Sequence, residues 1–224
     1  MNITAAVLCH NLHAHDRLDL FWQTWESLHV EGVRVIPVDN GSTDSTDELV
    51  ADLGGYVSKD RLTTCGHGTN LCARVAIGTD ADLCVLSDDD MRWLPGWAEQ
   101  LKAWWSAAPD DVLLTGCHVE PVFSWNEIHG RIVCGGVPGL IRASTGAASW
   151  SFLAGDWPRI GPVPDRVQGW GDVPTCQRII DAGYRVAQLN LAEHAGHGRS
   201  TWGNRTVEMH GWDIDPALAR LEIP

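Results

Sequence analysis

Along the first half of the chain, short apolar runs alternate with longer segments in which apolar residues recur at helical spacing. Apolar runs of this length, bounded by polar residues, are typical of buried strands in a parallel sheet. The pattern predicts strands at Ile3–Cys9, Val33–Val38, Gly55–Ser58, Leu83–Ser87 and Val112–Cys117, and helices at Leu18–His29, Ser45–Leu53, Asn70–Ile77 and Pro95–Ser106. Strands that alternate with helices indicate βαβ units and a mainly parallel sheet.

The second half of the chain has a different pattern. Residues 118–170 are rich in Gly, Pro and Trp and show only short β-like pieces. The later elements that the sequence predicts are strands at Arg131–Cys134, Ser149–Leu153 and Arg185–Leu189, a helix at Pro174–Ala182, and an ordered loop from Ala192 to Trp212. We therefore expect one α/β domain over residues 1–224, in which residues 1–117 bind a nucleotide and residues 118–224 shape a second substrate site.

Composition limits the classes of function. The chain has 224 residues, which suits one domain with a full core. Its 29 acidic and 16 basic residues give a net charge of −13, which opposes non-specific binding to nucleic acid or anionic membranes. The seven scattered cysteines contain no Cys-x-x-Cys pair and fit a reduced cytoplasmic protein. We see no signal peptide and no transmembrane segment.

Three consecutive carboxylates follow one of the predicted strands. Leu83–Ser87 leads directly into Asp88, Asp89 and Asp90. These carboxylates would repel one another unless a cation lies beside them. In open α/β sheets, ligands bind outside the carboxyl ends of the strands. The position therefore favours a divalent metal that carries a phosphate-bearing substrate, and the alternative is a solvated acidic turn.

Other polar residues are expected at the same edge of the sheet. Asp39 ends the second strand, so its carboxylate can accept hydrogen bonds from a uracil N–H or a ribose hydroxyl, and Asn11 would lie beside it. The Gly-rich segment 66–70 precedes a helix, so its backbone at Gly68 could approach the nucleotide closely. Arg74, about one turn into that helix, could reach diphosphate oxygens. The alternatives are a turn or capping role for Asp39 and a surface role for Arg74.

Four segments together resemble the nucleotide-sugar glycosyltransferases of family 2, which have the GT-A fold. The segments are Val38–Asp44 (VDNGSTD), Leu86–Asp90 (LSDDD), Gly169–Asp172 with Arg178 and Gly183–Arg185 downstream, and His194. The resemblance extends from Ile3 to about Thr201, in the family's order and spacing. It implies a Rossmann-like, mainly parallel sheet with helices on both faces, and an irregular C-terminal half that binds the acceptor.

The resemblance also implies a metal site and a donor. It places Asp90 on the metal, and Asp88 on the ribose or on the metal through water, with Asp89 as a spacer. His194 and His197 are both candidate metal ligands or diphosphate contacts, and His194 is favoured because it directly follows the strand-like segment. Oxygen ligands, few protein carboxylates and substrate phosphates describe Mn²⁺ or Mg²⁺. The metal would stabilise the leaving diphosphate of a nucleotide-diphosphate sugar.

The acceptor segment supplies a candidate base. An inverting transfer needs one carboxylate to accept the proton of the acceptor hydroxyl, and the resemblance assigns this role to Asp172. The acidic residue that usually precedes this Asp is replaced by Gly171. Asp172 could instead only cap the helix that follows. We expect Trp170 and Gly171 to line the acceptor site. Of Trp93, Trp97, Trp104 and Trp105, we expect most to lie in the core.

The sequence therefore predicts a metal-dependent, inverting glycosyltransferase that moves a sugar from a nucleotide-diphosphate sugar, with UDP-sugars favoured, to an acceptor hydroxyl. The alternatives are a retaining GT-A enzyme and a carbohydrate- or nucleotide-binding module without catalysis, which the Gly171 replacement motivates. A nucleotidyltransferase would share the sheet and the acidic site, but residues 169–185 argue against it. The acceptor stays open among a saccharide, a protein, a lipid head group and a hydroxymethylated DNA base, and the negative net charge counts against DNA.

Overall fold

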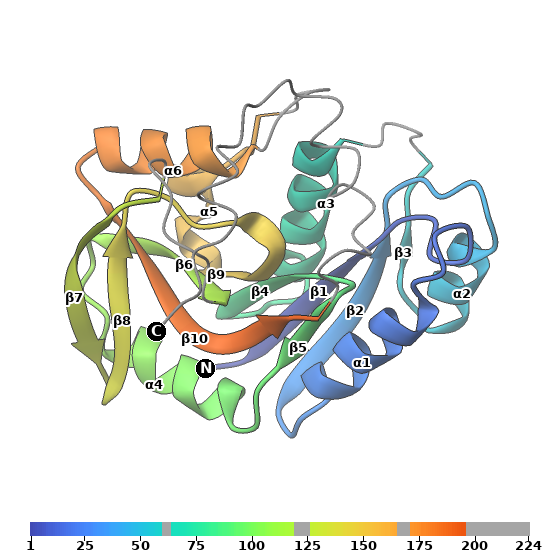
Figure 1. Cartoon of the computed structure of the whole chain (residues 1–224), viewed down its shortest axis with the longest axis horizontal. Helices are drawn as coiled ribbons and strands as arrows, with labels where there is room; N and C mark the ends of the chain where they lie inside the picture. Colours follow the sequence, from blue (N-terminus) through green and yellow to red (C-terminus); the bar gives the residue numbers. More distant parts are fainter. Residues whose placement is uncertain (60–63, 119–125, 165–170, 196–224) are drawn as a thin grey trace, which may run out of the picture.

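The computed structural model describes residues 1–59, 64–118, 126–164 and 171–195, which build one mixed sheet covered by helices on both faces (Figure 1). The first half contributes β1 (Ile3–Cys9), α1 (Leu18–Leu28), β2 (Val33–Asp39), α2 (Thr46–Asp52), β3 (Tyr56–Val57), α3 (Cys65–Ile77), β4 (Leu83–Asp88), β5 (Met91–Trp93), α4 (Trp97–Ala107) and β6 (Val112–His118). The second half contributes β7 (Ile128–Cys134), β8 (Val137–Arg142), β9 (Trp150–Leu153), α5 (Trp157–Ile160), α6 (Asp172–Asp181) and β10 (Arg185–His194).

The strand order is β3-β2-β1-β4-β9-β6-β10-β8-β7, and β5 pairs separately with β10. Strands β3, β2, β1 and β4 are parallel, as are β6 and β10. The remaining ladders are antiparallel, because β9 inserts between β4 and β6 and the β7–β8 hairpin adds to β10. Since β2 and β4 lie on opposite sides of β1, the carboxyl end of β1 is a topological switch point, where α/β sheets bind ligands.

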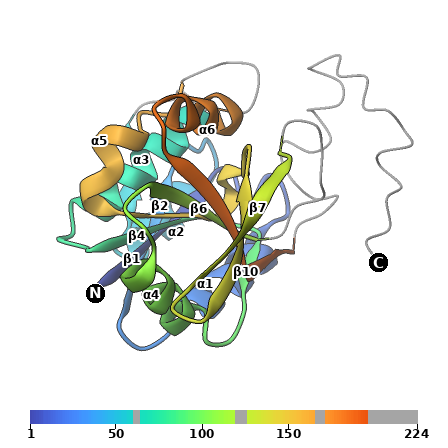
Figure 2. The same cartoon turned by 90° about the vertical axis from the view of Figure 1, so that its left-hand side faces the viewer.

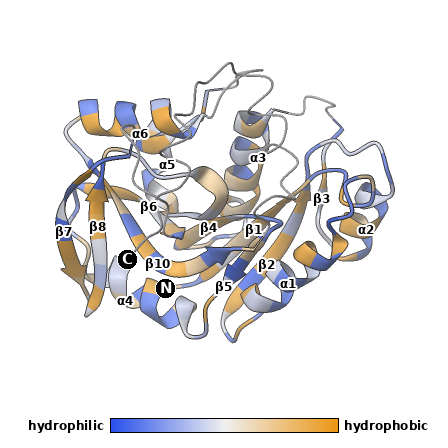
Figure 3. Cartoon of the chain, viewed as in Figure 1, coloured by the Kyte–Doolittle hydropathy of each residue, from blue (hydrophilic) through white to orange (hydrophobic). Residues whose placement is uncertain are grey.

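Two apolar cores lie on opposite faces of the sheet. One core takes side chains from α1 and α4, and the other takes side chains from α3, α5 and α6 (Figures 1 and 2). The strands between them are largely apolar, and the helices alternate apolar and polar positions (Figure 3). Trp93, Trp97, Trp104 and Trp105 are all buried in the core, which confirms their prediction. None of the helices among the described residues is long and apolar enough to cross a membrane.

The predicted α/β class with helices on both faces is confirmed, but some element boundaries were wrong. Helix α3 begins at Cys65 rather than Asn70, because the Thr64 hydroxyl caps it by accepting a hydrogen bond from the His67 backbone N–H (3.1 Å). Strand β10 continues to His194 instead of ending at Leu189, so the first part of the predicted loop is strand. Strand β5 was missed because it pairs with the distant β10, and strand β8, which forms a hairpin with the adjacent β7, was missed as well.

Candidate active site

At the carboxyl end of β2, Asp39 shapes the loop that follows. Its buried carboxylate accepts hydrogen bonds from the backbone N–H groups of Gly41 and Ser42, both at 3.1 Å. Asn11, which has a left-handed backbone (φ 49°), contacts the same loop. Its side-chain oxygen accepts a hydrogen bond from the Thr43 backbone N–H (2.7 Å), and its own N–H donates to the Ser42 hydroxyl (2.9 Å). The structure thus brings Asn11 and Asp39 together at one edge, as expected.

The three carboxylates after β4 already have a cation beside them, and that cation is Arg17. Asp89 and Asp90 are 4% and 2% exposed, and the Arg17 side chain, just before α1, is equally buried. Its Nη2 atom lies 2.8 Å from Asp90 Oδ2 and also forms an ion pair with Asp89. Asp89 is therefore more than a spacer. Sequence reasoning missed Arg17, because nothing near it in the chain signals a partner more than seventy positions away.

One guanidinium does not neutralise three carboxylates. Burial raises the pKa of Asp88 to about 7, the neighbouring Asp90 adds to this rise, and Arg17 opposes it. Burial also raises the pKa of Asp89 well above its usual range, again against the effect of Arg17. Burial is the larger cause of both rises, and repulsion between neighbouring carboxylates adds to it. The arrangement favours a further cation.

His194 comes to the same corner through strand pairing. Strand β10 pairs with β5 so that His194 is opposite Met91, and the Ala195 backbone N–H donates to the Asp90 carbonyl (2.7 Å). His194 Nε2 lies 3.6 Å from Asp90 Oδ1. This buried oxygen has no hydrogen-bond partner among the residues that the structure describes. The structure therefore joins two of the predicted metal residues, while His197 lies outside the described residues.

The corner does not contain a complete protein metal site. Within the described ranges, no group of three or more His, Cys, Asp or Glu side chains is arranged to hold a metal ion. A second imidazole is close, because His118 at the end of β6 has its ring centroid 6.2 Å from that of His194. His118 Nδ1 lies 2.6 Å from the Ser149 hydroxyl. Sequence reasoning missed His118, although it directly follows the predicted strand Val112–Cys117.

Helix α3 starts at this edge and packs closely on β1. A Cβ atom on Gly68 would lie 2.8 Å from Leu8 Cδ1 and 2.9 Å from Asn40 Nδ2, so glycine is needed for the approach. The Asn40 side chain also donates to the Thr64 carbonyl (3.3 Å), just before the helix. Gly68 is thus inside the helix rather than in a preceding turn. Its structural role is close packing of α3 on the carboxyl end of β1.

Arg74 is not where the sequence placed it. It lies in the last turn of α3, nine residues after Cys65, which is roughly 13 Å along the helix at 1.5 Å per residue. The helix runs back from the edge, and Thr79 just beyond it contacts Thr4 near the start of β1 (2.7 Å between hydroxyls). Arg74 borders a shallow groove with Tyr56 instead. The prediction that it lies one turn from the helix start is wrong, because Thr64 caps the helix earlier.

The candidate base lies at the start of α6. Asp172 is 3% exposed, and its Oδ1 accepts a hydrogen bond from the Val173 backbone N–H (2.8 Å). A Cβ on Gly171 would lie 2.4 Å from Val163 Cγ1, so an acidic side chain would not fit there without rearrangement. The Asn70 side chain makes two hydrogen bonds to the Val163 backbone, each 2.8 Å. The start of α6 is thereby tied to the first turns of α3.

Cys65, the first residue of α3, lies within electrostatic reach of both Asp88 and Asp172. Burial raises the pKa of the Cys65 thiol to about 12, and the carboxylates of Asp88 and Asp172 both add to this rise. A thiol with this pKa is not a nucleophile at neutral pH. Both carboxylates therefore act on the first residue of α3. Trp170, the remaining acceptor candidate, lies outside the described residues.

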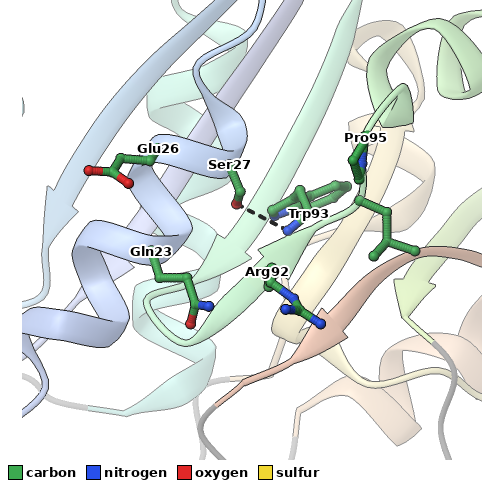
Figure 4. Close-up of a pocket in the computed structure, with 7 residues that line it drawn as sticks. Gln23, Glu26, Ser27, Arg92, Trp93 and Pro95 are labelled. Atoms are coloured by element: carbon green, nitrogen blue, oxygen red, sulfur yellow. Dashed lines mark hydrogen bonds between the residues drawn. The ribbon is translucent and has the colours of Figure 1, made fainter.

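A groove of about 550 Å³ lies apart from these residues, between α1 and the strand that follows Asp90 (Figure 4). Its lining residues are Gln23, Glu26, Ser27, Arg92, Trp93, Leu94 and Pro95. The Trp93 backbone N–H donates to the Ser27 hydroxyl (3.0 Å) and joins its two walls. None of the predicted site residues lines this groove, so we assign it no part in the chemistry.

The sequence profile of the family described as glycosyl transferase family 2 matches residues 12–148, which is more than half of the chain. None of the curated protein sequences matches this chain.

Solved structures share the fold at low sequence identity. A mannosyltransferase from Pyrobaculum calidifontis, in complex with GDP-Man and Mn²⁺, has 18% identity and a TM-score of 0.55 over 84% of this chain and 55% of its own. Residues 1–349 of S. aureus TarS have 12% identity and a TM-score of 0.59 over 89% of this chain and 62% of that fragment. The chain thus spans 55% and 62% of these two solved chains.

A third structure shows what the fold alone does not decide. CMP:2-keto-3-deoxy-manno-octonic acid synthetase, complexed with CTP, has 12% identity and a TM-score of 0.55 over 93% of this chain and 99% of its own. The sheet and its flanking helices are therefore those of the GT-A fold, but a synthetase that is not described as a glycosyltransferase shares them. The family match separates the two, and the fold does not.

Proposed function

The chain belongs to glycosyl transferase family 2, and from this premise we propose that it is a metal-dependent, inverting glycosyltransferase that moves a sugar from a UDP-sugar to an acceptor hydroxyl. One observation carries the proposal. Pairing of β5 with β10 sets His194 Nε2 3.6 Å from Asp90 Oδ1, a buried oxygen without a hydrogen-bond partner among the described residues. The carboxylate oxygen and the imidazole nitrogen that faces it form a pair of donor atoms for a divalent cation.

The donor atoms suit Mn²⁺ or Mg²⁺. Asp90 and His194 would hold the metal, and Asp88 would contact the ribose or reach the metal through water. These ions commonly take one or two protein groups and complete their coordination with water and substrate phosphates, so a three-residue protein site is not required. When bound, the metal would stabilise the charge on the leaving diphosphate. The Mn²⁺ and GDP-Man in the related mannosyltransferase structure support this class of cofactor and donor.

We place the nucleotide at the carboxyl ends of β1 and β2. Asp39 and Asn11 hold the loop 41–43 in place, and Gly68 lets α3 approach that loop's base. In this arrangement Asp39 contacts the uracil or the ribose, and the diphosphate extends toward the acidic corner. The TarS structure with UDP supports a uridine nucleotide, and the mannosyltransferase keeps a guanosine nucleotide as the alternative.

Asp172 is the proposed general base. It is buried at the start of α6 and acts electrostatically on Cys65 together with Asp88, which supports a position facing the donor site. One carboxylate is enough to take the acceptor proton in an inverting transfer, since the diphosphate leaves on the other face of the sugar. Trp170 and Gly171 would flank the acceptor. A retaining mechanism is the alternative if Asp172 proves dispensable.

The proposal leaves several acceptor classes open and names a cellular compartment. A saccharide, a protein, a lipid head group or a hydroxymethylated DNA base would each offer the required hydroxyl, and the net charge of −13 disfavours DNA. All seven cysteines are free thiols in the structure, which supports the reduced cytoplasm as the compartment.

A thermal-shift screen tests the proposal. UDP-sugars and GDP-sugars are added with Mn²⁺ or with EDTA to the wild-type protein, to Asp90→Ala, and to Asp110→Ala as a control at an exposed position. A ligand at a hundred times its Kd adds about 2.7 kcal/mol of stability. We expect a Mn²⁺-dependent rise in melting temperature that Asp90→Ala loses and Asp110→Ala keeps. An equal rise in EDTA, or one that survives Asp90→Ala, would overturn the metal site.

Turnover separates the enzyme from a binding module. With the best donor and Mn²⁺, the wild-type protein should release UDP, by transfer when a suitable acceptor is present or by slow hydrolysis without one. The binding-module alternative predicts the same thermal shift with no UDP release under any condition.

A further inference from the structure

Arg17 is fixed by the backbone at the point where the chain enters α1. Its N–H donates to the Leu12 carbonyl (2.9 Å), and its own carbonyl accepts from the Phe21 N–H (3.0 Å) in the first helical turn. Its side chain is 5% exposed. The backbone is thus held on both sides of Arg17, and its buried side chain ends beside the two aspartates that follow β4.

That position gives the two oxygens of Asp90 different surroundings. Oδ2 lies 2.8 Å from Arg17 Nη2, whereas Oδ1 lies 3.6 Å from His194 Nε2 and has no hydrogen-bond partner among the described residues. The same Nη2 also pairs with Asp89 Oδ1. A single guanidinium nitrogen therefore holds two adjacent carboxylates and leaves one oxygen of Asp90 directed at the histidine.

We propose that Arg17 is a positioning residue for the metal site: it holds Asp90 by one oxygen so that the other faces the metal and His194. The inference rests on the proposed function, since it takes Asp90 as a metal ligand. Without Arg17, repulsion among the three adjacent carboxylates would turn Asp89 and Asp90 away from each other. Asp90 Oδ1 would then no longer point toward His194. Partners that orient metal ligands typically change metal affinity by about 10- to 100-fold when they are removed.

Arg17→Gln tests this role, and Arg92→Gln is its matched control. Arg92 is also close to Asp90 in sequence, but it is 52% exposed and pairs with Glu193 on the surface. The readout is the Mn²⁺ concentration that gives half of the UDP-induced or GDP-induced thermal shift, which needs no turnover. We expect Arg17→Gln to raise this concentration by about tenfold or more, and Arg92→Gln to change it by less than about twofold.

Two further variants keep the test informative if Arg17→Gln folds poorly. Arg17→Lys retains the charge without the planar guanidinium, so it should recover most of the melting temperature measured in EDTA but only part of the Mn²⁺ affinity. The double variant Arg17→Gln/Asp89→Asn removes one charge of each sign. It should also recover stability while its Mn²⁺ requirement stays high.

The outcomes distinguish this inference from the proposed function. If the double variant regains wild-type Mn²⁺ affinity together with its stability, Arg17 is only structural and the inference is wrong. The same conclusion follows if stable Arg17→Gln protein has the Mn²⁺ requirement of the wild type. If the wild-type protein itself shows no Mn²⁺-dependent shift with either nucleotide, the metal site fails first, and the inference falls with it.

Discussion

Two regions of the molecule each place an aspartate at the end of a parallel strand, yet their surroundings differ. At the end of β2, the Asp39 carboxylate is satisfied by backbone N–H groups two and three residues further along. At the end of β4, Asp89 and Asp90 depend on Arg17, and one oxygen of Asp90 lies 3.6 Å from His194 without a hydrogen-bond partner in the described part of the chain. The first corner is complete in itself and shapes a loop. The second is short of positive charge, which is the condition for binding a cation.

The largest expected effect comes from removing the aspartate at the end of β4 and comparing the result with removal of the aspartate at the end of β2. Asp90→Ala should lower the rate of transfer by roughly 10³-fold or more and abolish the Mn²⁺ dependence of donor binding, because the stabilisation of the leaving group is lost. Asp39→Ala should weaken donor binding but leave its Mn²⁺ dependence in place. Initial rates over a Mn²⁺ titration measure both. Equal loss of Mn²⁺ dependence in the two variants would remove the distinction between the corners.

A second test asks whether chemistry and donor binding belong to different elements. Asp172→Asn should lower the transfer rate by roughly 10²-fold or more while the donor Kd stays near the wild-type value, since the amide cannot accept the proton. Single-turnover rates and calorimetric donor binding give the two quantities. Full activity in this variant would exclude Asp172 as the base and reopen the retaining mechanism.

A third test concerns the close packing at the nucleotide corner. Gly68→Ala should lower the free energy of unfolding by about 1–3 kcal/mol, because the new Cβ meets Leu8 and Asn40 at less than 3.0 Å. It should also raise the donor KM. Gly130→Ala is the control, since a Cβ there has no atom within 4 Å. Urea denaturation measures the stabilities, and equal values for the two variants would contradict the packing argument.

The smallest expected effect is a pH-dependent contribution of Asp44, in the loop after β2, to the stability of the protein. Burial alone would raise the pKa of Asp44, but hydrogen bonds from Thr46 and Ala14 lower it below its usual value of 3.8. A carboxyl whose folded-state pKa is lowered stabilises the protein above its unfolded pKa, and this stabilisation disappears as the pH falls through the folded value. Asp44→Asn should therefore cost well under about 1 kcal/mol at pH 7, since the group is partly exposed to solvent.

Urea titrations of both proteins between pH 7 and pH 3 check this prediction. The difference in unfolding free energy between wild type and Asp44→Asn should shrink as the pH falls below about 4. A difference that stays constant with pH would show that Asp44 acts through packing rather than through its charge.

The sequence by itself determined the features that depend on neighbouring residues. Strand β1 matches its predicted bounds, and β2 and β4 each extend only one residue past theirs, because an apolar run that meets a polar stop is a local signal. The positions of Asp39 and of Asp88–Asp90 at strand ends followed directly. The family resemblance added His194 and Asp172, which the structure places beside Asp90 and at the start of α6.

Only the tertiary structure decided what these residues contact. The short β5, the insertion of β9 between β4 and β6, and the pairing of Arg17 with Asp89 and Asp90 all join segments far apart in the chain. Arg74 shows the same limit. The Thr64 hydroxyl caps α3 five residues before the predicted helix start, so Arg74 lies in the last turn of the helix instead of the first. Periodicity reports which face of an element is buried, whereas the partners on that face are set by packing and strand order.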